Sequence, residues 1–169
     1  LVGSPTPDPQ SGCAIGTSFA SSPLPGESSV GSLTYMERLL KRVLFVCTEN
    51  SNRSQMAEAF ARMHGEGILE AHSAGSHPSG SVNPRAISAM QEVGYDLSTH
   101  RSKSLDEIPR DPYDLAVTMG CGDDCPLLPA THREDWDLPD PRDMGPDEFR
   151  RIRDRIESLI ERLIEEIGP

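Results

Sequence analysis

Short apolar runs alternate along the chain with stretches in which apolar residues recur every three or four positions. The clearest run, residues 42–47, reads RVLFVC, and a continuous apolar run of this length is typical of a buried strand in a parallel sheet. The runs predict three strands, over residues 42–47, 69–75 and 113–120.

The stretches with helical spacing predict three helices, over residues 54–65, 83–94 and 146–169. The middle helix has Asn83 as a favourable cap, Pro84 in its first turn and Gly94 after its end. The last stretch is amphipathic over most of its length.

The order strand, helix, strand, helix, strand, helix predicts a three-layer α/β domain with a central parallel sheet flanked by helices. Such sheets bind ligands beyond the carboxyl ends of their strands. Because Cys47 and Cys121 both stand at such ends, we expect the chemistry at this edge of the sheet.

The first 35 residues differ in composition from the rest. Of these residues, 18 are Pro, Gly or Ser and none is Lys or Arg. Such a segment cannot bury enough apolar surface to offset the entropy of ordering it. We therefore expect residues 1–35 to be a disordered extension, either a native tail or upstream sequence, and residues 36–169 to form the domain.

The chain carries 16 basic and 27 acidic residues, a net charge of −11. Nucleic acids and anionic membranes favour clustered Lys and Arg, so we expect neither as a partner. The four cysteines are too few for a disulfide scaffold. Free thiols fit a reducing, cytoplasmic setting, in which cysteines are catalytic, redox-active or metal-binding.

Residues 47–54, CTENSNRS, connect the first predicted strand to the first predicted helix. A loop in this position gathers backbone N–H groups and the helix dipole into an anion site, and Arg53 adds a fork that matches a tetrahedral oxyanion. The positive potential favours the thiolate form of Cys47, which we expect to be the nucleophile. Ser54 can donate a hydrogen bond to Cys47, and Asn50 can hold the shape of the loop. The alternative is a structural cysteine and a surface arginine at chance spacing.

The residues that we expect to bind the anion are Thr48, Glu49, Asn50, Ser51, Asn52, Arg53 and Ser54. The segment VLFVCTENSNRSQMAEAF resembles the C-x5-R-S loop of the low-molecular-weight protein tyrosine phosphatase superfamily. NRSQMAEAF is most similar to its arsenate reductase branch, the thioredoxin- or thiol-coupled type. The resemblance continues through VTMGCGDDCPLLP and WDLPDP. It implies the fold of that superfamily and the reduction of arsenate to arsenite, an arsenic-detoxifying reaction, through a cysteinyl-arsenate adduct on Cys47.

An oxygen leaving group needs a proton donor on its far side. The resemblance implies that this donor is the aspartate of an Asp-Pro pair, Asp140. The other carboxylates nearby, Asp135, Asp137 and Asp143, are expected to be solvated, and Trp136 is expected to anchor the loop by packing.

The resemblance also implies a thiol–disulfide relay, in which Cys121 attacks the Cys47 sulfur and Cys125 resolves the product. Electrons then come from thioredoxin, a glutaredoxin-like protein or a small thiol, with no bound cofactor. Cys121 and Cys125 stand closer in sequence than in well-known thioredoxin-coupled members. At helical i, i+4 spacing their Cβ atoms would lie about 5–6 Å apart, beyond the roughly 3.8 Å of a disulfide. They can bridge only from a loop or an unwound turn, and an external thiol of the glutathione, mycothiol or bacillithiol type is the alternative to either.

Other positions depart from the family. Glu49 stands where glycine is common, and a carboxylate beside a bound dianion is unfavourable unless it points outward. Some members bind potassium beside the loop, and Asn50 and Glu58 match two of its ligands. The remaining ligand positions hold Arg101 and Lys103, which cannot coordinate a cation, so we expect no metal site.

Two rival functions stay open. A tyrosine phosphatase of the same fold would hydrolyse phosphomonoesters through a phosphocysteine, but such enzymes typically place aromatic residues after the Asp-Pro pair, where this chain has Arg142 and Asp143. A zinc-binding module would use Cys121, Cys125 and His132, although the usual second pair of closely spaced ligands is missing.

Overall fold

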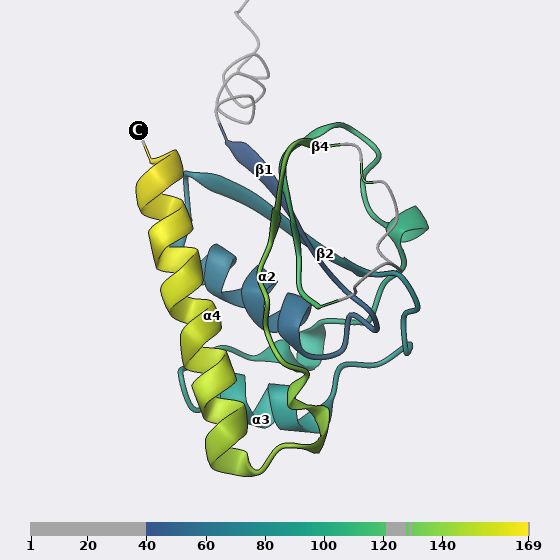
Figure 1. Ribbon diagram of the computed structural model, residues 1–169, viewed down its shortest axis with the longest axis vertical. Helices are drawn as coiled ribbons and strands as arrows, with labels where there is room; N and C mark the ends of the chain where they lie inside the picture. Colours follow the sequence, from purple (N-terminus) through teal and green to yellow (C-terminus); the bar gives the residue numbers. More distant parts are fainter. Residues whose placement is uncertain (1–39, 121–127, 129, 169) are drawn as a thin grey trace, which may run out of the picture.

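A four-stranded parallel sheet forms the centre of the computed structural model, which describes residues 40–120, 128 and 130–168 (Figure 1). The strand order is β2-β1-β3-β4, and each neighbouring pair is parallel. The strands are Lys41–Cys47 (β1), Leu69–Gly75 (β2), Tyr113–Thr118 (β3) and Ala130–Asp135 (β4). The helices are Arg53–His64 (α2), Pro84–Gln91 (α3) and Pro146–Ile167 (α4), with 3-10 turns at Leu97–Thr99 (η1), Leu105–Glu107 (η2) and Pro141–Asp143 (η4).

The predicted α/β fold is confirmed, with every predicted strand and helix present. None of the described helices is long and apolar enough to cross a membrane. At the start of α3, the Asn83 side chain accepts a hydrogen bond from the Arg85 amide and Pro84 occupies the first turn, as the sequence predicts.

Strand β4 was not among the predicted elements. All of its residues after Ala130 are exposed, so it shows no alternation of apolar and polar positions. Its strand conformation comes from backbone pairing with β3, in which Leu115 lies opposite His132. Such pairing depends on the tertiary structure and cannot be predicted from the pattern of residues in the strand alone.

Both faces of the sheet are buried at its central strands, β1 and β3. One face packs on the α-helices and the other on the segment that includes η2. The helix-covered side contains Val43, Phe45, Leu115 and Val117 of the sheet with Phe60, Met90, Ile156 and Ile160 of α2, α3 and α4. The opposite side contains Leu44, Val46, Ala116, Ile108 and Leu128. Trp136 is buried with its ring centroid 5.8 Å from that of Phe45, which confirms its expected packing role.

The strand register brings three chain segments together at the carboxyl edge of the sheet. Cys47 at the end of β1 lies opposite Gly75 at the end of β2, and the Met119 amide donates to the Val46 carbonyl at 2.8 Å. A Cβ on Gly75 would lie 2.8 Å from the Thr48 carbonyl oxygen. Only glycine therefore lets β2 approach the loop that follows β1.

Candidate active site

The loop between β1 and α2 turns its carbonyl groups outward. The carbonyls of Cys47, Thr48, Glu49 and Ser51 accept hydrogen bonds from backbone amides in the segment 76–83, at 2.8–3.2 Å. Because these carbonyls are bonded to that segment, the opposite side of the peptide groups, with their amides, and the amino end of α2 are available to a ligand. Both favour an anion.

Cys47 lies at the base of this loop and is 3 % exposed. Its Sγ is 3.0 Å from the Ser54 Oγ, and that oxygen is 2.9 Å from the Asn50 Nδ2. Since the Asn50 amide donates to Ser54, the Ser54 hydroxyl is free to donate its own proton to the Cys47 sulfur. Both contacts that the sequence predicts for Ser54 and Asn50 are present, and they place the Ser54 hydroxyl as a hydrogen-bond donor to the Cys47 sulfur.

Asn50 has a left-handed backbone, with φ 48°, and its side chain is held on several sides. Its Oδ1 accepts from the Lys103 amide and from the Gln55 Nε2, both at 2.8 Å. Gln55 Oε1 in turn lies 2.9 Å from His100 Nδ1, and His100 Nε2 lies 2.9 Å from the Tyr95 hydroxyl. Because Gln55 uses its Nε2 toward Asn50, its Oε1 accepts, and His100 carries its proton on Nδ1.

Burial lowers the pKa of His100, and the cations Arg62 and Lys103 act in the same direction, while Glu58 and Asp96 oppose it. The neutral imidazole is the form that completes this network. The sequence analysis assigns no role to His100. The residues around it, THRS, do not indicate a hydrogen bond to Gln55 in α2.

A buried carboxylate lies behind Asn50. Glu58 is 1 % exposed, accepts a hydrogen bond from the Ser73 hydroxyl and pairs with Lys103 Nζ at 3.1 Å. Arg62, one helical turn further along α2, also pairs with Glu58. The chain thus supplies two cations of its own, Lys103 and Arg62, to the buried Glu58 carboxylate.

Arg53 extends from the start of α2 toward the loop that holds Asp140. Its Nη1 donates to the Leu138 carbonyl at 2.8 Å, and its Nη2 pairs with Asp140 Oδ2 at 3.0 Å. The guanidinium is 5 % exposed, and its Nε has no hydrogen-bond partner within the described part of the chain. A buried donor without a partner is costly, so this atom fits an acceptor such as a bound oxyanion.

Gly120, after the end of β3, is packed against the same guanidinium. It has φ +66°, and a Cβ there would lie 2.5 Å from Arg53 Nη1. The relay candidates Cys121 and Cys125 follow directly in sequence but lie outside the described residues, as does the predicted extension.

The Glu49 side chain is partly exposed and bonded on two sides. Its carboxylate accepts a hydrogen bond from the Ser51 hydroxyl and pairs with the guanidinium of Arg142, which stands two residues after Asp140. The hydrogen bond to Glu49 raises the pKa of Arg142. Pairing with a cation offsets the unfavourable charge of a carboxylate next to a bound dianion. The expected solvated carboxylates, Asp135, Asp137 and Asp143, are exposed.

Potential metal ligands gather elsewhere. Among the described residues, the His64, Glu157 and Glu161 side chains place three ligand atoms within 4.8 Å of one another. His64 is eleven residues after Arg53 on α2, about 16 Å along the helix axis, so this group is remote from Cys47. His132, a ligand of the zinc alternative, is exposed on β4, and its two cysteine partners are outside the described residues.

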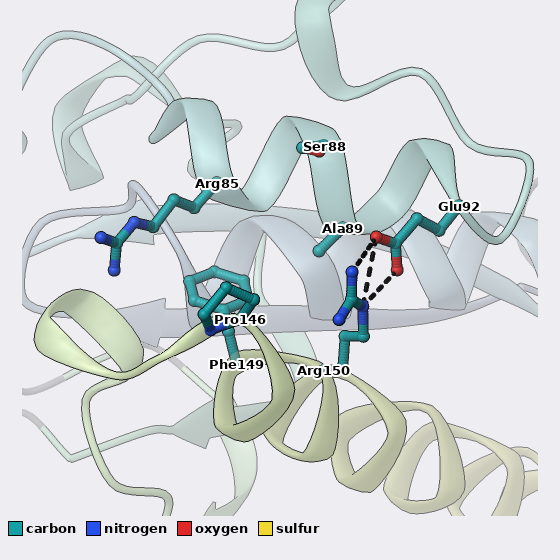
Figure 2. Close-up of a pocket in the computed structure, with 7 residues that line it drawn as sticks. All are labelled: Arg85, Ser88, Ala89, Glu92, Pro146, Phe149 and Arg150. Carbon is teal, nitrogen blue, oxygen red and sulfur yellow. Dashed lines mark hydrogen bonds and ion pairs between the residues drawn. The ribbon is translucent and has the colours of Figure 1, made fainter.

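A hollow of about 180 Å³ lies between α3 and α4, on the helical layer (Figure 2). Its lining residues are Arg85, Ser88, Ala89, Glu92, Pro146, Phe149 and Arg150. Arg150 pairs with Glu92 across it at 2.8 Å. Since no residue of the 47–54 loop lines this hollow, the reaction site and the hollow are separate.

Comparison with known proteins identifies the family to which this chain is related. The family model described as low molecular weight phosphotyrosine protein phosphatase matches residues 42–168. A glutaredoxin arsenate reductase from Synechocystis sp. is 40 % identical over 132 residues, covering 76 % of this chain and all of the relative. Arsenate reductase 2 from Staphylococcus epidermidis is 42 % identical over 125 residues, covering 72 % of this chain and 94 % of the relative.

A solved structure described as an arsenate reductase in the phosphate binding state superposes with a TM-score of 0.69 at 39 % identity. The match covers 76 % of this chain and all of that one. The residues that the family model matches, 42–168, include Cys47, Arg53 and Asp140.

Proposed function

Since the chain belongs to the low molecular weight phosphotyrosine protein phosphatase family, we propose that it reduces arsenate to arsenite with Cys47 as the nucleophile. The observation that carries the proposal is the assembly of a buried thiol, an anion-binding loop and a buried guanidinium opposite a carboxyl group. These are the parts that displacement at a tetrahedral oxyanion requires.

In the first step, Cys47 Sγ attacks the arsenic atom of arsenate. An As–O bond breaks, and the departing oxygen takes a proton from Asp140 and leaves as water. Arg53 and the loop amides stabilise the negative charge on the remaining oxygens. The product is a cysteinyl-arsenate adduct in which arsenic is still pentavalent.

In the second step, a thiol attacks the Cys47 sulfur of the adduct. The electron pair of the S–As bond passes to arsenic, which leaves as trivalent arsenite, and the two sulfurs form a disulfide. We assign the attacking thiol to Cys121 and the resolving thiol to Cys125, so that a Cys121–Cys125 disulfide is the final oxidised form. Two thiols supply the two electrons.

The electron donor is thiol-based, because only an external thiol can exchange with the disulfide that the reaction leaves. A relative is named a glutaredoxin arsenate reductase, which favours a glutaredoxin-like protein or the small thiol that it uses. Thioredoxin is the alternative. Parallel assays with each donor separate them, since the true donor restores multiple turnover at the lower concentration.

Phosphatase activity is the second candidate, because the same thiol and guanidinium can displace the alcohol of a phosphomonoester. The family model is named for phosphotyrosine, and aryl phosphate hydrolysis needs Cys47, Arg53 and Asp140 but not the other two cysteines. Initial rates with arsenate and with p-nitrophenyl phosphate at equal enzyme concentration decide which reaction dominates.

The relay is tested by Cys121→Ser and Cys125→Ser. Both should keep aryl phosphate hydrolysis and lose multiple-turnover arsenate reduction. Cys121→Ser should stop at the adduct on Cys47, whereas Cys125→Ser should complete one turnover and accumulate a Cys47–Cys121 disulfide, visible by mass spectrometry. Undiminished donor-coupled arsenate turnover in both variants would refute the internal relay and assign the reduction to an external thiol.

A further inference from the structure

Two ion pairs join the anion loop to the loop that holds Asp140. Arg53 pairs with Asp140 within the site, and Glu49 pairs with Arg142 beside it. The side chains of the second pair are partly exposed, 49 % for Arg142 and 32 % for Glu49. In the first pair Arg53 is buried and Asp140 is 46 % exposed, so that pair runs from the buried base of the site to its surface, whereas the second pair lies at the rim.

Arg142 is fixed relative to the proton donor. Its backbone amide donates to Asp140 Oδ1 at 3.1 Å, within the turn η4. Its carbonyl accepts from Arg85 Nη1 at 3.2 Å, and Arg85 also donates to the Met144 carbonyl at 2.8 Å. The start of the Arg142 side chain is thus held next to Asp140 by contacts on both sides.

Glu49 is fixed relative to the anion loop. Its backbone carbonyl accepts from the Ser102 hydroxyl at 2.8 Å and from the Ser79 amide at 3.1 Å. Its carboxylate accepts from the Ser51 hydroxyl at 3.2 Å. With both ends anchored, the pair spans the gap between the two loops.

The position of this bridge bears on the leaving group. The proton from Asp140 goes to the departing oxygen, so a substituent on that oxygen lies on the Asp140 side of the site, and Arg142 of the bridge is bonded to Asp140 through its backbone amide. Arsenate and phosphate carry only hydrogen there. An ester carries a carbon group that needs this space.

We propose that Glu49 and Arg142 form a bar across the mouth of the site that selects inorganic oxyanions over phosphate esters, an inference that rests on the proposed function. The bar acts on specificity, because it touches the space of the leaving group rather than the sulfur. It also neutralises the negative charge of the Glu49 carboxylate, which belongs to the anion loop.

The test is the ratio of kcat/KM for p-nitrophenyl phosphate to kcat/KM for arsenate, measured for each variant. A change in the charge of the rim alters the affinity for both anionic substrates alike, so it does not alter the ratio of their kcat/KM values. Arg142→Ala and Glu49→Ala should each raise it by about tenfold, the scale on which a pocket separates substrates by size. The double variant should raise it no further, because both changes open the same bar.

Two controls accompany these variants. Arg142→Lys retains a cation that can reach Glu49 and should leave the ratio near that of the unmodified protein. Arg155→Ala deletes an exposed arginine on α4 and should leave it unchanged. An unchanged ratio in both Arg142→Ala and Glu49→Ala, or a rise in only one of them, would overturn the bar.

The unmodified protein separates this failure from that of the proposed function. If it hydrolyses the aryl phosphate but does not reduce arsenate with any thiol donor, the proposed function fails, and the bar fails with it. If it reduces arsenate and the variants keep its ratio, only the bar fails.

Discussion

Replacing Gly120 by alanine should disable the oxyanion site through one added methyl group. The backbone at Gly120 has φ +66°, and the new Cβ would lie 2.5 Å from Arg53 Nη1 and 3.1 Å from the Leu138 carbonyl oxygen. The guanidinium is the end of a flexible side chain, so it is the group that gives way. Its displacement removes the 2.8 Å hydrogen bond to Leu138 and moves the fork that is aimed at the anion.

The structure offers a matched control for the backbone contribution. Gly94 has φ +87°, and a Cβ there would meet no atom within 4 Å. In Gly94→Ala and Gly120→Ala alike, the left-handed conformation should cost about 1–2 kcal/mol. In a chain of this size each kcal/mol lowers the melting temperature by about 2–4 °C. Gly120→Ala should lose somewhat more, because the charged hydrogen bond of Arg53 is also lost.

The catalytic rates of Gly120→Ala and Gly94→Ala should differ much more than their stabilities. Aryl phosphate hydrolysis should fall about 100-fold in Gly120→Ala, the typical effect of removing one preorganised charge-stabilising donor, and inorganic phosphate should inhibit it more weakly. Gly94→Ala should hydrolyse the ester at the unmodified rate. Equal rates and equal phosphate inhibition in both variants would refute the claim that Gly120 makes room for Arg53.

Three further outcomes are expected. Cys47→Ser should abolish both arsenate and aryl phosphate turnover in a folded protein, because a hydroxyl is not ionised at neutral pH, and activity above about a tenth of normal would contradict its role. A protein of residues 36–169 should match the full chain in melting temperature and turnover, and a loss of several degrees would mean that the extension packs on the domain. The lowered pKa of His100 means that its contribution to stability is complete above its ordinary value of 6.5 and is lost as the pH falls through the folded value. Urea denaturation should therefore give a smaller difference in the free energy of unfolding between about pH 7.5 and about pH 5.5 for His100→Gln than for the unmodified protein. An equal difference in the two proteins would contradict this assignment.

The elements that the sequence predicts correctly are those with a strong local pattern. The continuous apolar run forms the strand β1, and the apolar residues at helical spacing form the helix α4, because both elements are stabilised by burying these residues. The anion loop is equally local, since Cys47, Asn50, Arg53 and Ser54 lie within eight consecutive positions. Their mutual contacts follow from that short spacing.

What the sequence does not predict depends on contacts between distant positions. Glu49 and Arg142 are 93 residues apart, and neither residue type indicates the other as a partner. His100 reaches Asn50 only through Gln55, a link that exists because η1 and α2 are packed together. The pairing of Lys103 with Glu58 depends in the same way on the fold, although the sequence does indicate that these positions are unusual.

Strand β4 has a consequence for how copies of the protein meet. It is the last strand in the order of the described sheet, only six residues long, and its exposed residues include His132, Arg133, Glu134 and Asp135. A strand from a second molecule that tried to extend the sheet at this side would have to bury charges of both signs. The polar composition that prevented the prediction of β4 thus disfavours edge-to-edge aggregation. Without these side chains, the unpaired backbone groups of an edge strand could pair with another molecule.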